Sequence, residues 1–177
     1  MDKQFLVEQL TSRLRESAVV ARKAGQAAEE EARDGATASE KRENARVSQE
    51  YSGLARGQKE RANRTLAELA TLETFRPPAR LPSRGPVSLG AIVEMEMEME
   101  MEVEMEDDET RNAQGRTFFL APVGAGIELT GPGGDGFLSV VTPVSPVGKA
   151  VLGKRVGDTI EVMVKGEPRE WTITFVE

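Results

Sequence analysis

The side chains able to do chemistry in this sequence are chiefly carboxylates and lysines, because the chain contains neither histidine nor cysteine. This absence excludes disulfides, thiolate metal sites, an ordinary zinc site, a Ser-His-Asp triad and a Cys-His pair. Two carboxylates stand out, those of Glu40 and Glu43, which are predicted to begin a helix. Residues three apart share one helix face, so both groups can point at one spot. The alternative is that they only compensate the helix dipole, since acidic residues are favoured in any first turn.

The net charge of −7 comes from one segment rather than from the whole chain. Residues 94–109 contain ten acidic side chains and no basic one, and without them 23 basic residues stand against 20 acidic ones. A nearly neutral remainder does not indicate general nucleic-acid binding, and we expect no specific DNA binding.

Nothing in the sequence predicts a membrane segment. A transmembrane helix needs about 18 or more apolar residues in a row, and no such run is present. The N-terminus also lacks the apolar stretch of a secretory signal. We therefore expect no membrane association and a cytoplasmic location.

The first 75 residues are predicted to form a helical hairpin. In residues 3–33 apolar side chains recur at steps of three and four, and no proline interrupts them. After a break at Asp34–Ser39, a second apolar stripe runs through residues 40–74 and ends before Pro77, which a helix interior does not accommodate. Two such helices joined by a short turn bury both stripes by pairing antiparallel, as a coiled coil with a slim polar tip. The stripe of the second helix is expected to contain Val47, Tyr51, Leu54, Ala62, Leu66, Leu69, Leu72 and Phe75.

The remainder of the chain predicts a β-rich domain behind a linker. Residues 76–86, rich in proline and arginine, form the linker, and residues 87–177 are expected to fold alone as an α+β domain with an antiparallel sheet. One short helix is predicted over residues 146–152, with Ser145 as its N-cap and Pro146 at its first position. Clear strand patterns occur at Thr117–Ala121, Phe137–Thr142, Thr159–Val164 and Glu170–Val176.

A repeat that alternates apolar residues, mostly methionine, with glutamate runs from Glu94 to Glu106. A period of two predicts a strand with one buried face. The alternative to a solvated acidic face is an electronegative surface that meets a basic partner. We expect the glutamates to face solvent and the core to receive Met95, Met97, Met99 and Met101.

Two stretches resemble the Gre-type (GreA/GreB) transcript-cleavage and elongation factors of bacterial RNA polymerase. The run Val144–Asp158, which begins Val-Ser-Pro-Val-Gly-Lys, resembles a Ser-Pro-capped helix and two following turns of that family's C-terminal domain. Glu31-Ala32-Arg33, followed by Glu40–Ala45, resembles the tip of the family's coiled coil. The resemblance implies a coiled-coil hairpin over residues 1–75 and, over residues 87–177, a domain similar in fold to FKBP-type prolyl isomerases.

The resemblance also implies a function. In the family, tip carboxylates enter the secondary channel of RNA polymerase, help to hold the second catalytic Mg²⁺ and orient a water that hydrolyses backtracked RNA. Carried onto this sequence, these carboxylates are Glu40 and Glu43, with Asp34 as a candidate third contributor. Mg²⁺ prefers hard oxygen ligands, and two metals support the attacking and leaving oxygens. The chain would then be an accessory factor without a cofactor of its own, and not an enzyme.

RNA polymerase is the partner that the resemblance implies, with indirect contact to the 3′ end of the nascent RNA. Near the tip, Lys41, Arg42 and Asn44 are candidate partner-binding residues, with a solvated helix face as the alternative for the two cations. In the C-terminal domain the candidates are Ser145 and Pro146, because this domain docks at the rim of the secondary channel in the family.

The same resemblance allows a second function, that of a regulator which occupies the secondary channel and inhibits or modulates transcription without promoting cleavage. Departures from the family pattern favour it: the tip connection is longer, Lys41 stands where leucine is usual, and Glu40 stands where aspartate is usual. Two further classes are a prolyl isomerase, by fold analogy alone, and a plain coiled-coil adaptor.

Overall fold

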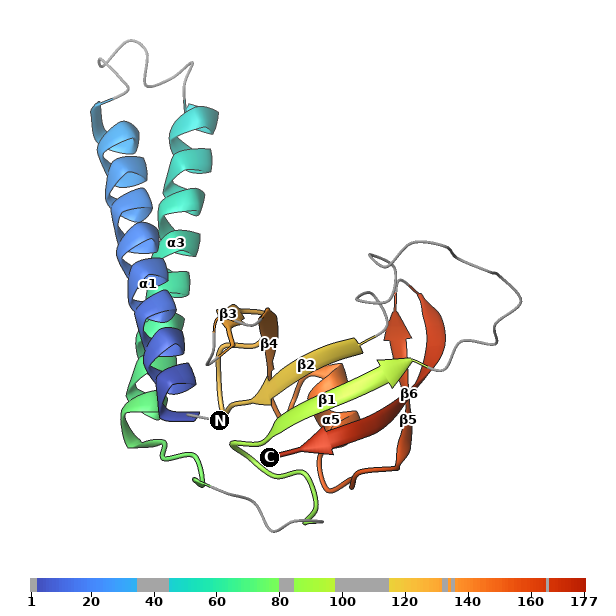
Figure 1. Cartoon of the computed structure of the whole chain (residues 1–177). Helices are drawn as coiled ribbons and strands as arrows, with labels where there is room; N and C mark the ends of the chain where they lie inside the picture. Colours follow the sequence, from blue (N-terminus) through green and yellow to red (C-terminus); the bar gives the residue numbers. More distant parts are fainter. Residues whose placement is uncertain are drawn as a thin grey trace. The chain divides into compact units, whose positions relative to one another are not determined.

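The computed structural model describes residues 3–34, 45–79, 85–97, 115–131, 134, 136–164 and 166–177 (Figure 1). The chain divides into two compact units. One unit is Thr11–Glu73, and the other joins the N-terminal residues up to Leu10 to Thr74–Glu177. The first turns of the N-terminal helix thus belong to the unit that holds the sheet, a grouping that differs from the boundaries expected at residues 75 and 87.

The helical hairpin consists of two antiparallel helices, α1 (Lys3–Asp34) and α3 (Ala45–Thr74), as predicted (Figure 1), and the first unit is its part from Thr11 to Glu73. Near one end, the Ser48 hydroxyl donates to the Ala32 carbonyl oxygen over 3.5 Å. Further along, a Cβ built on Gly25 would lie 3.5 Å from the Cβ of Gln58. Residue numbers therefore increase along α1 in the direction in which they decrease along α3, so the two helices are antiparallel. The second helix ends before the two prolines, as expected, whereas its predicted start at residue 40 lies outside the described residues.

The seam between the helices is built on a seven-residue repeat. On α1 the buried positions include Leu14, Ala21 and Ala28, and on α3 they include Ala55, Ala62 and Leu69. Spacing of seven is the signature of a coiled coil, in which such residues insert into the facing helix. The seam thus narrows from leucine to alanine toward the end where α1 finishes, which lets the backbones approach closely.

The predicted stripe of α3 was wrong at Leu54 and Leu66, whose side chains are 51% and 56% exposed. Their neighbours Ala55 and Thr65 are buried in their place. The reason is that Ala55 continues the heptad of Ala62 and Leu69, so the adjacent leucine is turned out of the seam.

Two glycines of α3 offer a test of the hairpin's stability. Gly53 and Gly57 are exposed, and a Cβ added at either would meet no atom within 4 Å. Glycine in a helix interior costs up to about 1 kcal/mol relative to alanine. Replacing both with alanine is expected to raise the free energy of unfolding of the hairpin by about 1–2 kcal/mol, measured by urea denaturation. A loss of stability would mean that the two positions need glycine for a reason other than packing.

In its described residues, the second unit contains a six-stranded sheet, the short helix α5 and the first turns of α1. The strand order is β3-β4-β2-β1-β6-β5. The elements are β1 (Ile92–Met97), β2 (Gly115–Leu120), β3 (Glu128–Thr130), β4 (Phe137–Val141), α5 (Pro146–Val151), β5 (Thr159–Val164) and β6 (Glu167–Val176). The α+β class, with a helical hairpin and a mainly antiparallel sheet, is confirmed.

One strand pair departs from the antiparallel pairing expected throughout. β2 and β4 run parallel, with Phe118 opposite Ser139, because the chain first passes through β3 at the outer edge of β4. Sequence reasoning missed β3, since a three-residue strand is too short to show a period of two.

The predicted register of β1 is confirmed for its described residues, because the methionines lie on the face of the sheet that carries the main core cluster. Met95 is 1% exposed, Met97 packs against the same cluster, and Glu96 is exposed. Met99 and Met101 lie outside the described residues. The cluster also contains Val87, Ala91, Val93, Phe118, Leu120, Val141, Val151, Ile160, Val162, Trp171 and Ile173.

In the part of the chain that the structure describes, no helix is long and apolar enough to cross a membrane.

Candidate functional site

The predicted tip residues belong to the segment that connects α1 with α3. α1 ends at Asp34, whose side chain is not described, and α3 begins at Ala45. Glu40, Lys41, Arg42, Glu43 and Asn44 lie outside the described residues. Chain connectivity alone puts them between the ends of the two helices, so their mutual geometry stays a prediction.

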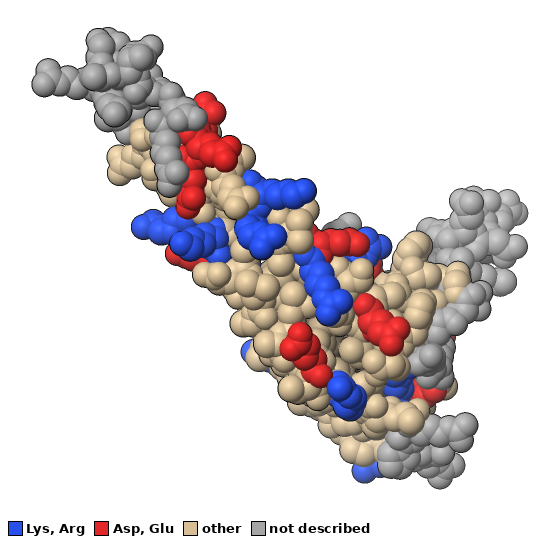
Figure 2. All heavy atoms as spheres, turned by 90° about the vertical axis from the view of Figure 1, so that its left-hand side faces the viewer, with Lys and Arg blue, Asp and Glu red and all other residues tan. Residues whose placement is uncertain are grey.

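The charged side chains exposed near the tip are mostly acidic. Those exposed farther from the tip, on the part of the two helices that we call the shaft, are mostly basic. Glu29, Glu30 and Glu31 are exposed in the last turns of α1. Exposed cations follow along the shaft, and Figure 2 shows Lys and Arg side chains spread over it. They are Arg13, Arg15, Arg22 and Lys23 on α1 and Arg56, Lys59, Arg61 and Arg64 on α3.

Sequence reasoning missed this basic shaft because it averaged charge over everything outside the acidic segment. The signal was present locally. Residues 13–23 and 56–64 each contain four basic side chains and a single glutamate. Gly25 packs against Ala55, Gln58 and Lys59, so the antiparallel pairing brings the end of the first segment, at Arg22 and Lys23, next to the second segment and joins the two local excesses.

A shallow groove of about 470 Å³ lies between the helices near the acidic turns. Its walls are Glu29 and Ala32 of α1 and Ser52, Ala55, Arg56 and Lys59 of α3. The small side chains at 32, 52 and 55 leave this space open. Within the described ranges, no three acidic side chains come together in a way that would hold a metal ion.

Near the tip, Arg46 forms an ion pair with Glu50 over 3.3 Å. Both side chains are largely exposed, at 90% and 67%, so the pair adds little to stability. Arg46 is a cation beside the tip that a partner can reach.

In the second unit, Ser145 caps α5 as predicted. Its hydroxyl accepts hydrogen bonds from the backbone N–H groups of Gly148 and Thr142, both at 3.2 Å, and donates to the Thr142 carbonyl oxygen at 2.8 Å. Pro146 follows in the first turn and is exposed. These bonds give Ser145 a structural role, and the exposed Pro146 is the better placed of the two to contact a partner.

Gly148 explains why the motif holds glycine two residues after its proline. A Cβ at this position would overlap the Thr142 carbonyl oxygen, which is the acceptor for Ser145. The motif therefore has two structural reasons. Ser145 caps the helix, and Gly148 leaves room for the Thr142 carbonyl oxygen.

Exposed apolar side chains lie just before and just after α5 in the sequence. Val144 is 77% exposed, Leu152 is 45% exposed and Val156 is 51% exposed. The turn that follows is held by Asp158, whose carboxylate accepts from the Arg155 backbone N–H at 2.8 Å. Capped helix, exposed valines and Gly-Asp turn all fall within one stretch, Val144–Asp158.

This stretch lies inside a wider match. Residues 82–177, more than half of the chain, match the model of the family described as "Transcription elongation factor, GreA/GreB, C-term". The chain belongs to this family. It is therefore a transcription elongation factor whose partner is RNA polymerase, in a family of accessory factors rather than catalysts.

Among solved structures, this GreA/GreB-family chain is similar to the "GreA factor homolog 1 (Gfh1) protein of Thermus thermophilus", with 18% identity over 97% of this chain and 94% of that one and a TM-score of 0.37. It is also similar to Thermus aquaticus Gfh1, with 19% identity over 99% and 91% of the two chains and a TM-score of 0.38. No curated protein matches the chain significantly.

Proposed function

We propose that this GreA/GreB-family factor inserts its helical hairpin into the secondary channel of RNA polymerase and stimulates the cleavage of backtracked RNA. Family membership is the observation that carries this proposal. The two antiparallel helices support it, because their only connection, residues 35–44, contains Glu40 and Glu43. Those carboxylates, with Asp34 as a candidate third, would assist the polymerase's own Mg²⁺.

The chemistry asked of the tip is limited to positioning. Polymerase supplies the metal ions, and hard carboxylate oxygens are suitable ligands for a second Mg²⁺ that keeps several waters. A second metal supports the attacking and leaving oxygens of a phosphodiester hydrolysis. The chain then needs no metal site and no cofactor of its own.

The basic shaft supports entry into a channel that contains RNA. Its eight cations would contact RNA phosphates or carboxylates of the polymerase, and Lys41 and Arg42 would continue this surface to the tip. Docking of the second unit would use the stretch around α5, where Pro146 and the exposed Val144, Leu152 and Val156 offer contact area.

A regulator that binds the same channel without promoting cleavage is the second candidate. The observation favouring it is the tip sequence, in which Lys41 replaces the usual leucine within a longer connection. A cation beside the two glutamates would compete with Mg²⁺ for their charge.

Backtracked elongation complexes test both functions in one experiment. Polymerase binding and RNA cleavage are measured with and without the full-length protein. Binding with faster cleavage supports the first function, and binding with unchanged or slower cleavage supports the second. If polymerase does not bind the protein at all, both are refuted.

A further inference from the structure

The first two turns of α1, Lys3–Leu10, belong to the unit that holds the sheet. We call this segment the strap. Three of its four large apolar side chains, Leu6, Val7 and Leu10, are buried with 0–4% exposure, whereas Phe5 is 42% exposed. A helix end that only began a coiled coil would have no reason to share a compact unit with strands more than a hundred residues away.

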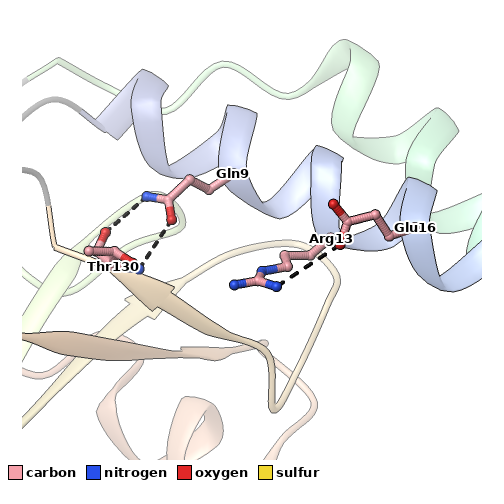
Figure 3. A network of polar contacts seen from close by, with 4 residues as sticks. All are labelled: Gln9, Arg13, Glu16 and Thr130. Atoms are coloured by element: carbon pink, nitrogen blue, oxygen red, sulfur yellow. Dashed lines mark hydrogen bonds and ion pairs between the residues drawn. The ribbon is translucent and has the colours of Figure 1, made fainter.

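At one end of the strap, Gln9 pairs with the backbone of β3. Its side-chain amide nitrogen donates to the Thr130 carbonyl oxygen at 2.9 Å, and its amide oxygen accepts from the Thr130 N–H at 3.1 Å (Figure 3). β3 is the edge strand of the sheet and pairs only with β4 among the described strands. One side-chain amide thus occupies the place where a neighbouring strand would bind.

Next to Gln9, Leu10 fits against a glycine. Gly124 is buried with a φ of +84°, and a Cβ there would lie 2.7 Å from a methyl carbon of Leu10. A side chain at position 124 would be strained by the backbone and would push the leucine away. The loop before β3 is therefore shaped to receive the strap.

The other end of the strap is held by a buried lysine. Lys3 is 3% exposed, and its Nζ donates to the Pro78 carbonyl oxygen at 3.2 Å. Burial lowers the pKa of Lys3, and the negative charge of Glu177 opposes this shift in part. A buried cation on a carbonyl oxygen marks a specific contact, because an unpaired buried charge is costly.

The sheet has a second apolar face for the strap to cover. Phe118 belongs to the core beside α5, so its neighbour Phe119 must point to the opposite face. Phe119 is nevertheless fully buried, as are Ile92, Leu129 and Val140, none of which belongs to that core cluster. Burying these side chains requires cover from outside the sheet, and the strap brings leucines to the same unit.

We propose that the strap is a conformational device that closes the second face of the sheet and shields the edge of β3 from pairing with other chains. In the closed state, Gln9 satisfies both backbone groups of Thr130, which the edge strand would otherwise present for intermolecular pairing. Opening would free those groups and expose apolar surface together. This role is independent of tip chemistry and of any effect on RNA cleavage.

The test uses full-length Gln9→Ala and Gln9→Glu, with Gln26→Glu, an exposed position of the same helix, as the matched control. Hydrogen-exchange protection of the Thr130 amide is measured by NMR. In Gln9→Ala, loss of two hydrogen bonds is expected to lower the protection factor about tenfold or more, while β5 and β6 keep theirs.

Gln9→Glu separates the strap from a general loss of stability. At neutral pH its carboxylate accepts from the Thr130 N–H but repels the carbonyl oxygen, so protection falls. Below about pH 4 the protonated carboxyl also donates to that oxygen, and protection returns. Gln26→Glu shows no such change. Self-association, followed by sedimentation, is expected for Gln9→Glu at neutral pH and not in acid. If the Thr130 amide keeps its wild-type protection in Gln9→Ala, the proposed closure by the strap is wrong. If the strap opens without self-association, its proposed shielding role is wrong.

Discussion

Replacing Glu40 and Glu43 together by alanine is expected to slow factor-stimulated RNA cleavage about a hundredfold or more. Under the proposed function, both carboxylates help hold the polymerase's second Mg²⁺, and methyl groups cannot replace them. Loss of metal positioning worth several kcal/mol corresponds to a rate change of this size, since about 1.4 kcal/mol is tenfold. The measurement is single-turnover cleavage in backtracked complexes at saturating factor.

Glu29→Ala/Glu30→Ala is the matched control. Both glutamates are exposed on α1 and carry the same charge, but they lie behind the tip. Their loss is expected to change cleavage severalfold at most. Polymerase binding should survive in both double variants, because docking would rest on the shaft and the second unit. Undiminished cleavage by Glu40→Ala/Glu43→Ala would refute the assignment of the tip pair.

Gly148→Ala is expected to destabilise the second unit by about 3 kcal/mol, the upper range for overpacking a well-packed site. Its Cβ would overlap the Thr142 carbonyl oxygen, which belongs to the backbone and accepts the Ser145 hydroxyl. Relief would require α5 to move and the N-cap to break. The measurement is the free energy of unfolding from urea denaturation, followed by the fluorescence of Trp171, the single tryptophan of the chain.

Gly115→Ala serves as the comparison, because position 115 is exposed in β2 and a Cβ there would meet nothing within 4 Å. Its effect is expected to stay within about 0.5 kcal/mol, as for most surface substitutions. Similar losses for the two variants would mean that Gly148 is not placed as described, and that α5 tolerates a side chain there.

The hairpin and most strands could be predicted because their signals are local. Apolar residues at helical steps, the stop before Pro77, and the period of two around Met95 each report one element from a few neighbouring residues. Ser145 was predictable for the same reason, since an N-cap involves only the first turn of its helix. The order of these elements along the chain determined the fold class.

Choices between adjacent positions were not local. Leu54 and Ala55 are both apolar, and the larger one was expected in the seam, yet the leucine is exposed. The facing helix decides this, because in a coiled coil the side chains that insert between those of the partner helix recur every seven residues along both helices. In the same way, the two basic segments join only because the pairing of α1 with α3 brings Gly25 against Gln58 and Lys59.

By itself, then, the sequence determined the elements, their caps and the family, all of which depend on short stretches of chain. Tertiary structure decided which residues share a surface. Gln9 and Thr130 are 121 residues apart, and a glutamine on a helix face or a threonine in a short strand is unremarkable alone. Their pairing depends on how β3 reaches the edge of the sheet and on the space left by Gly124. No local pattern encodes either, because both arise from packing between segments that are distant in sequence.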